Sequence, residues 1–200
     1  MVKEMNGKGK EYYDNGNLKF DGEYLNGKKW TGIGYNRMNN IEYELKDGKG
    51  LIKEYKDYDP FYDDFYFEAE YLNGEINGKG KYYYNGKLEF EGEYLNNKRN
   101  GKGKEYYRNG KLRFEGEYLN DKRNGKGKEY YDNGRLKFEG EYLYLNGKKH
   151  GKGKEYHNNG NLKFDGEYLN GETNGKGKEY DYNGHLIFEG EYLNGEKKEQ

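Results

Sequence analysis

The stretch GKGKEYYRNGKLRFEGEYLNDKRN, from Gly101 to Asn124, is repeated along most of the chain. The following stretch, GKGKEYYDNGRLKFEGEYLYLNGKKH from Gly125 to His150, is nearly the same with two residues inserted. Self-similarity at a short period is the signature of a repeat architecture. Starts of the form Gly-x-Gly are separated by 25, 16, 30, 23, 24, 26 and 24 residues, and they occur at Gly7, Gly32, Gly48, Gly78, Gly101, Gly125, Gly151 and Gly175. We therefore expect about eight copies of one structural repeat.

One repeat has the pattern of a β-hairpin. From Leu112 to Tyr118, apolar residues and glycine alternate with charged residues, which is typical of a half-buried strand. Residues 101–107 predict a second strand, and Asn109-Gly110 between the two is a strong hairpin signal. The repeat that starts at Gly78 is one residue shorter before its Asn-Gly turn, so its turn type or a bulge must differ. The chain is thus predicted to be all-β.

Pairing consecutive repeats predicts a register. If Tyr118 faces Gly125, then Glu117 faces Lys126, and Glu115 faces Lys128 on one side of the sheet. On the other side Gly116 faces Gly127, and Leu112 faces Tyr131. The paired glycines would leave room for tyrosine rings to lie across the backbone.

This register places Glu129 between Phe114 and Phe138 on the apolar side. A carboxylate there is costly unless it reaches water or a partner. The pattern leaves open whether Tyr130 or Tyr131 faces inward.

Composition limits the classes of function. Charged residues (36%) outnumber hydrophobic ones (31%), but 26 tyrosines at regular positions favour an ordered protein with a modest core. The 36 Lys and Arg nearly balance the 37 Asp and Glu, so no nucleic-acid partner is expected. The absence of cysteine excludes disulfides and thiolate chemistry, and no apolar segment is long enough to span a membrane. The expectation is a soluble, cytoplasmic protein.

The repeated motif resembles a known family. The run Phe-Glu-Gly-Glu-Tyr followed by Asn-Gly-Lys-Gly-Lys-Glu-Tyr-Tyr-x-Asn-Gly is similar to the MORN repeat, in the variant form that ends in a Tyr-Tyr-x-Asn-Gly turn. One copy has its signature residues at Phe114, Gly116, Tyr118, Gly125, Gly127, Tyr131 and Gly134. The resemblance implies an elongated, twisted, single-layer antiparallel sheet of about eight tandem hairpins. It also implies a binding or scaffolding role, linked in some members to phospholipids.

The organisation follows from the repeats. Residues 1–200 are interpreted as a single repeat array, with a regular repeat at 7–31 and five regular repeats at 78–194. Between them, residues 32–77 form two degenerate repeats. The first of these is shortened and lacks the Phe-x-Gly-x-Tyr strand, and the second carries an aromatic and acidic insert at 56–66. Residues 195–200 are a charged tail that could cap an open sheet edge.

Aromatic residues in and near the insert are the first candidate site. Buried aromatic anchors dominate many protein interfaces, and the candidates for partner binding are Trp30, Tyr35, Tyr58, Phe61, Tyr62 and Phe65. The alternative is that these aromatics repair the core of the damaged second repeat. The acidic residues Asp57, Asp59, Asp63 and Asp64 suggest oxygen ligands for calcium. Their spacing does not match the EF-hand loop, acidic surface loops are common, and no metal site or cofactor is predicted.

Paired basic residues between hairpins are the second candidate site. Stacked loops at ~9–10 Å spacing would form a basic rim able to meet an anionic membrane. The rim would consist of Lys28, Lys29, Lys98, Arg99, Lys122, Arg123, Lys148 and Lys149, interrupted by Glu75 and Glu172. The alternative is a solvated edge neutralised by nearby carboxylates.

The sequence therefore predicts a non-catalytic scaffold that binds a protein through its tyrosine-rich sheet face. The alternative is peripheral binding to anionic phospholipids through the basic pairs. A homodimer through open sheet ends and an inert spacer are further alternatives. Catalysis is not expected, because the chain has no serine and only two threonines, and its three histidines stand at unrelated positions that suggest surface substitutions.

Overall fold

The described part of the chain is built from β-strands. A computed structural model describes residues 6–55, 65–143 and 147–198, and these contain 17 strands and no helix. They form two compact units, an N-terminal unit (Met1–Lys98) and a C-terminal unit (Arg99–Gln200). The predicted class, an antiparallel all-β fold of tandem hairpins, is confirmed. The positions 56–64 of the insert lie outside the described residues.

The N-terminal unit contains two runs of paired antiparallel strands. Its first sheet consists of β1 (Gly7–Tyr12), β2 (Leu18–Leu25), β3 (Lys28–Tyr35) and β4 (Ile41–Leu45). The second run consists of β5 (Gly50–Tyr55), β6 (Phe65–Leu72), β7 (Glu75–Tyr84) and β8 (Lys87–Leu95). The shortened second repeat does have a second strand, β4, in which Tyr43 replaces the expected phenylalanine and packs on Gly34.

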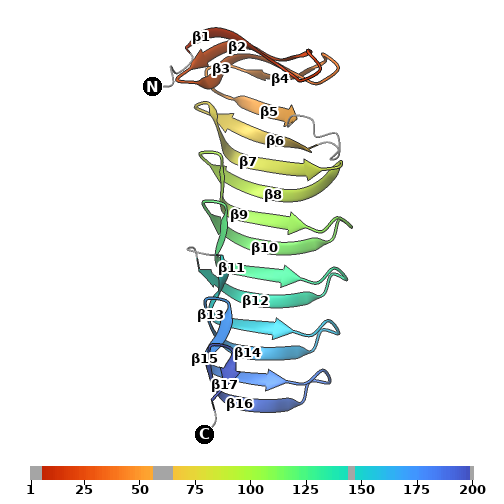
Figure 1. The fold of residues 1–200 in the computed structure, drawn as a ribbon, viewed down its shortest axis with the longest axis vertical. Helices are drawn as coiled ribbons and strands as arrows, with labels where there is room; N and C mark the ends of the chain where they lie inside the picture. The colour runs from red at the N-terminus through yellow and green to blue at the C-terminus, as the bar shows by residue number, and fades with distance from the viewer. Residues whose placement is uncertain (1–5, 56–64, 144–146, 199–200) are drawn as a thin grey trace. The chain divides into compact units, whose positions relative to one another are not determined.

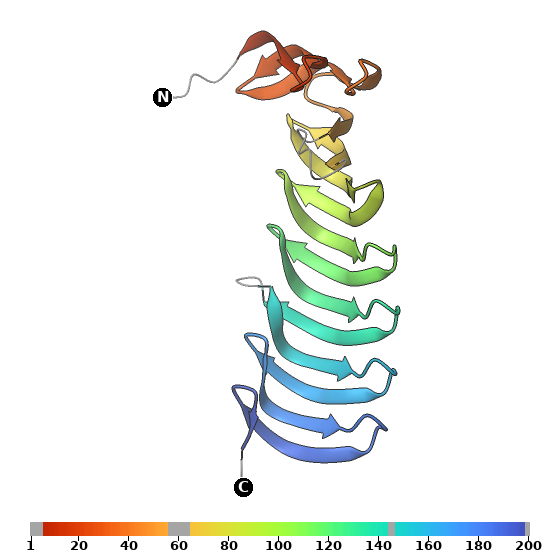
Figure 2. The same cartoon turned by 45° about the vertical axis from the view of Figure 1, so that its right-hand side comes forward.

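The strands of the C-terminal unit follow one another in chain order and are visibly curved (Figure 1, Figure 2). They are β9 (Lys98–Tyr106), β10 (Leu112–Leu119), β11 (Lys122–Tyr130), β12 (Leu136–Leu143), β13 (Lys148–Tyr156), β14 (Leu162–Leu169), β15 (Glu172–Tyr180), β16 (Leu186–Leu193) and β17 (Glu196–Lys197). Four hairpins of closely similar register therefore stand in series.

The register between hairpins is partly as predicted. Gly116 pairs with Gly127, and Glu115 pairs with Lys128. Beyond Gly116 a register shift pairs Tyr118 with Arg123, so the predicted pairing of Tyr118 with Gly125 is wrong. Two extra residues of β11, Gly125 (φ +61°) and Lys126, form a bulge opposite β10 and account for the shift. The bulge brings the basic pair into the strand.

A second shift occurs near the Asn-Gly turn. Leu112 pairs with Tyr106 within its own hairpin, not with Tyr131 of the next, and the extra residue Arg113 lies between Leu112 and Phe114. Since directly paired residues share a face of the sheet, Leu112 lies on the face of Tyr106. The predicted grouping of Leu112 with Phe114 is therefore wrong.

The turn of the shorter repeat also differs, as predicted. Asn85 and Gly86 both have positive φ (+49° and +69°), and Tyr84 pairs directly with Lys87. Positive φ at both central residues is the requirement of a tight type I′ turn. The longer repeats have a different turn, as residues 107–111 show. Among these residues only Gly110 has positive φ, and a hydrogen bond of 2.9 Å from the Tyr107 N–H to the Lys111 carbonyl closes the loop.

The core of the C-terminal unit is a row of aromatic rings on one face. Phenylalanine and tyrosine rings alternate in edge-to-face contact, with 5.2–5.6 Å between neighbouring ring centres. Their order is Tyr118, Phe114, Tyr142, Phe138, Tyr168, Phe164, Tyr192 and Phe188. A Cβ on Gly127 would lie 2.7 Å from the Phe114 ring and 3.2 Å from that of Tyr142. The phenylalanines, more than the predicted tyrosines, occupy the space above the paired glycines.

Candidate functional site

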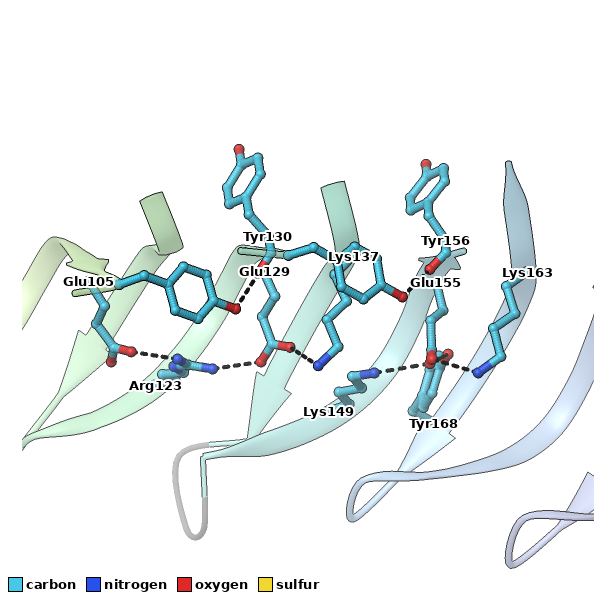
Figure 3. Close-up of polar contacts among 12 residues, drawn as sticks. Glu105, Arg123, Glu129, Tyr130, Lys137, Lys149, Glu155, Tyr156, Lys163 and Tyr168 are labelled. Carbon is cyan, nitrogen blue, oxygen red and sulfur yellow. Dashed lines mark hydrogen bonds and ion pairs between the residues drawn. The ribbon is translucent and has the colours of Figure 1, made fainter. Parts of the chain in front are cut away.

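A ladder of charged residues lies beside the aromatic row. Each hairpin of the C-terminal unit contributes one glutamate that is paired directly with a phenylalanine, namely Glu105, Glu129, Glu155 and Glu179. Arg123 bridges two of them, with its Nη2 2.6 Å from Glu105 and its Nη1 2.6 Å from Glu129 (Figure 3). We call this side of the sheet the ladder face. The partner that the buried position of Glu129 requires is therefore Arg123.

The rung at Glu155 follows the same plan. Lys149 and Lys163 each lie 3.0 Å from Glu155 (Figure 3). The side chains of Arg123, Glu105, Glu129 and Glu155 are only 17–20% exposed. In the N-terminal unit Lys29 makes the corresponding contacts, with Glu11 at 3.0 Å and with Glu54.

The cations of the ladder also cover the aromatic core. The Arg123 guanidinium lies 3.9 Å from the centre of the Phe114 ring, and Lys149 lies 4.3 Å from that of Phe138. Cations over aromatic faces gain free energy, more so when desolvated. Tyrosine hydroxyls complete the arrangement, since that of Tyr118 donates to Glu105 at 2.7 Å. The ladder covers the core of a sheet on which no second layer of described strands packs.

The predicted basic rim is corrected by this geometry. The pairs do not lie in loops, because they begin the strands β3, β9, β11 and β13. The second member of a pair faces the ladder, as Lys29, Arg123 and Lys149 show by their ion pairs, and Arg99 contacts Glu105 at 3.8 Å. The second member of each pair is thus engaged in the fold.

The first members of the pairs lie near the edge of the sheet. Lys28 forms an ion pair with Glu75 at 2.8 Å, and Lys98 is exposed at the start of β9. In the C-terminal unit the four equivalent exposed positions are Lys122, Lys148, Glu172 and Glu196, whose charges cancel. This edge of the sheet is therefore not uniformly positively charged.

The ladder makes stability depend on pH. Burial acts to raise the pKa of Glu105, but the hydrogen bonds and charge of Arg123 outweigh it and hold this pKa below its usual value. At Glu155 burial is likewise outweighed, here by Lys149 and Lys163, so its pKa is also lowered. A carboxylate whose pKa is lowered in the folded state stabilises the fold at pH values above its unfolded-state pKa, which is about 4.3. That stability is lost as the pH falls through the folded-state pKa.

We expect the variant Glu155→Gln to unfold at lower urea concentration than the parent at pH 7. The difference should shrink steadily below about pH 4.5, because the parent glutamate is then itself becoming neutral. Urea midpoints measured by circular dichroism at several pH values between 7 and 3 would test this. A difference that stays constant over this range would show that Glu155 acts through its shape and not its charge.

The opposite face carries a different pattern. Tyr130 and Tyr156 point away from the ladder (Figure 3), and their hydroxyls donate to Glu115 at 2.6 Å and to Glu139 at 2.7 Å. A tyrosine is paired directly with a leucine in each hairpin, namely Tyr106–Leu112, Tyr130–Leu136, Tyr156–Leu162 and Tyr180–Leu186. We call this row of eight side chains the Tyr–Leu stripe. Its members are half-buried, apart from Leu186, which is 50% exposed.

The second tyrosine of each Tyr-Tyr pair links neighbouring hairpins. The Tyr107 hydroxyl donates to the Tyr130 carbonyl, and the Tyr131 hydroxyl donates to the Tyr156 carbonyl, both at 2.7 Å. In the next hairpin His157 takes this place, with its Nε2 3.1 Å from the Tyr180 carbonyl. The histidine is thus half-buried and structural, not the surface substitution predicted. Tyr131 lies toward the ladder, because Lys137, a partner of Glu129, is placed over its ring.

The predicted aromatic site is only partly described. Trp30 and Tyr35 lie near opposite ends of β3, about 16 Å apart along the strand. Trp30 packs against Gly48, where an added Cβ would lie 2.6 Å from the indole ring, and so stabilises a turn. Tyr58, Phe61 and Tyr62 lie outside the described residues, and the side chain of Phe65 is not described either. The role of this site in binding remains a prediction.

The ladder cations were not identified as such from the sequence. The available signal was the glutamate placed between two phenylalanines, which demanded a cation at a fixed offset in each repeat. Within residues 6–55, 65–143 and 147–198, no group of three or more acidic or histidine side chains has the geometry of a metal site. The same residues contain no helix that could cross a lipid bilayer.

Comparison with known families agrees with this geometry. The family model described as MORN repeat matches residues 67–87, 90–111, 114–134 and 164–186, and the model described as MORN repeat variant matches residues 5–26 and 149–170. A search of curated proteins found no match. MORN repeats are generally non-catalytic and are associated with binding of proteins or membranes. The matches cover more than half of a chain that has the expected hairpins, so it belongs to the MORN repeat family.

Proposed function

We propose that this protein binds another protein through the Tyr–Leu stripe of its C-terminal unit. The observation that carries the proposal is the direct pairing of a tyrosine with a leucine at the same register in every hairpin of this unit. Successive tyrosines are then two strand spacings, or about 9–10 Å, apart. Such a row of amphipathic rings suits a partner that presents apolar side chains at a matching interval.

The two sets of tyrosines differ in their availability. Those of the ladder face, such as Tyr118 at 3% exposure and Tyr168 at 4%, are used in the core. Those of the stripe are half-buried on a face that no other described part of this unit covers. Tyrosine gives a binding surface a large apolar area with little loss of side-chain entropy. The stripe is therefore the tyrosine-rich surface best suited to contact a partner.

The charges around the stripe favour a protein over a polyanion. Lysines and acidic residues face each other across the strands, as in the pairs Lys128–Glu139, Lys154–Asp165 and Lys178–Glu189. A balanced pattern of both signs can orient a complementary protein. It supplies no net attraction for phosphates, and the cancelled charges at the sheet edge add none. The membrane alternative accordingly becomes an outcome to be tested.

The test compares two variants with matched chemistry. The stripe variant carries Tyr130→Thr, Leu136→Thr, Tyr156→Thr and Leu162→Thr, because threonine retains strand propensity while removing apolar area. The control carries four threonines on the same face at exposed lysines, namely Lys102, Lys126, Lys152 and Lys176. Proteins captured from a cell extract by the parent are identified first, and the dissociation constant of each purified candidate is then measured.

The stripe variant should bind the partner at least about 100-fold more weakly, since several anchors are removed at once. The control should lose only a few-fold in affinity. Equal binding by both variants would exclude the stripe. Co-sedimentation with anionic liposomes that survives near-physiological salt, and that is lost on Lys122→Glu with Lys148→Glu, would support the membrane alternative instead.

A further inference from the structure

The last full hairpin of the C-terminal unit departs from the ladder pattern at two positions. Thr173 in β15 stands where β11 has Arg123 and β13 has Lys149. At the bulge of β16, Ile187 stands where the preceding hairpins have Lys137 and Lys163. Both replacements remove a positive charge from the ladder face beside the same carboxylate, that of Glu179.

Glu179 consequently has fewer cationic partners than its equivalents. Glu129 contacts Arg123 and Lys137, and Glu155 contacts Lys149 and Lys163. Within the described residues the one ion pair of Glu179 is with Lys197 of β17, at 2.9 Å. The Glu179 side chain is also 30% exposed, against 17–20% for the three preceding glutamates.

The neighbouring ring is incomplete in the same way. Phe114, Phe138 and Phe188 each have a cation over the ring, at 3.9, 4.3 and 5.0 Å from the ring centre. In the part of the chain that the structure describes, none is placed over Phe164. Phe164 keeps its edge-to-face contacts with Tyr168 and Tyr192, and it is 4% exposed where Phe114 and Phe138 are fully buried. One rung of the ladder thus lacks its cation, although its phenylalanine remains buried.

We propose that this rung, which lacks its own cation, binds a cationic side chain of another protein. We name it the cation rung and define it by Phe164, Thr173, Glu179 and Ile187. The entering group would take the place that Arg123 holds two hairpins earlier, between a phenylalanine ring and a glutamate. Ile187, 54% exposed, would contact the aliphatic stem of the same side chain.

An arginine fits the cation rung better than a lysine. The planar guanidinium stacks on aromatic faces, and its fork of N–H donors matches a carboxylate. The chain itself shows this match, since Arg123 lies closer to its ring than Lys149 or Lys197 and reaches two glutamates. The cation rung lies on the ladder face, so it stands independently of the Tyr–Leu stripe.

The first experiment uses N-acetyl-arginine amide as the probe. Added at constant ionic strength to isotope-labelled protein, it should shift the Thr173 amide, the Ile187 methyl groups and the Phe164 ring protons. One cation–ring contact with one carboxylate predicts a weak dissociation constant, roughly 10–100 mM. N-acetyl-citrulline amide, a neutral analogue of the same shape, should shift these signals far less.

The second experiment fills the rung from within. In Thr173→Arg the new guanidinium should occupy the site, abolish the response to the probe, and slow amide exchange in β15 and β16 by roughly two- to thirtyfold. Thr173→Val, which adds no charge, should keep the response. Equal shifts with citrulline, an undiminished response in Thr173→Arg, or equal shifts around Glu129 would each overturn the proposal.

Discussion

Replacing Phe138 by alanine should lower the free energy of unfolding by about 3–5 kcal/mol, the usual cost of removing a buried phenylalanine. Phe138 is fully buried, and its ring centre lies 5.6 and 5.4 Å from the ring centres of Tyr142 and Tyr168. Its face also supports Lys149, so the loss would extend to the charged ladder. Because a domain has only about 5–15 kcal/mol of stability, the effect would be visible as a large drop in the urea midpoint.

The control for this prediction is Phe188→Ala in the last full hairpin. Phe188 is half-buried and, among the described residues, contacts one aromatic ring, that of Tyr192, where Phe138 contacts two. Its loss should therefore cost less, about 2 kcal/mol. Equal costs at the two positions, measured by denaturant titration followed by tyrosine fluorescence, would contradict the idea of a continuous aromatic row.

The variant Gly140→Ala should be nearly as damaging, with a cost of about 3 kcal/mol. An added Cβ would lie 2.6 Å from the Phe138 ring and 2.8 Å from both the Gly153 Cα and the Lys152 carbonyl oxygen. Two of these three neighbours are backbone atoms that cannot turn aside. The strands would have to separate or the ring would have to leave its place above the paired glycines.

Gly110→Ala separates crowding from backbone strain. Gly110 has φ +80° in an exposed turn, with no atom within 4 Å of an added Cβ, so its substitution costs about 1 kcal/mol through strain alone. We expect calorimetry to show a clearly lower melting temperature for Gly140→Ala than for Gly110→Ala. The reverse order would mean that the glycine pairs serve turn flexibility and not close packing.

The sequence by itself determined the hairpin repeat and its paired glycines. Alternation in the Phe-x-Gly-x-Tyr strand and the Asn-Gly turn are local signals, and they act through backbone geometry within a few residues. The pairing of Gly116 with Gly127 followed from matching such patterns in neighbouring repeats. The sequence also showed that Glu129 needed a partner, without showing which one.

Only the tertiary structure decided what each face presents. The bulge at Gly125 adds two residues to β11, so that Arg123 lies opposite Tyr118 on the ladder face. The bulge at Arg113 brings Leu112 onto the face of Tyr106. The shift at Arg113 is one residue, and it moves Leu112 to the opposite face because strand periodicity is two. Alternation alone therefore placed the basic pairs in loops and left Tyr130 and Tyr131 unassigned. The missing cation at Thr173 could be recognised only from the structure, where the equivalent residues Arg123 and Lys149 lie over phenylalanine rings. These contacts depend on the packing of neighbouring hairpins.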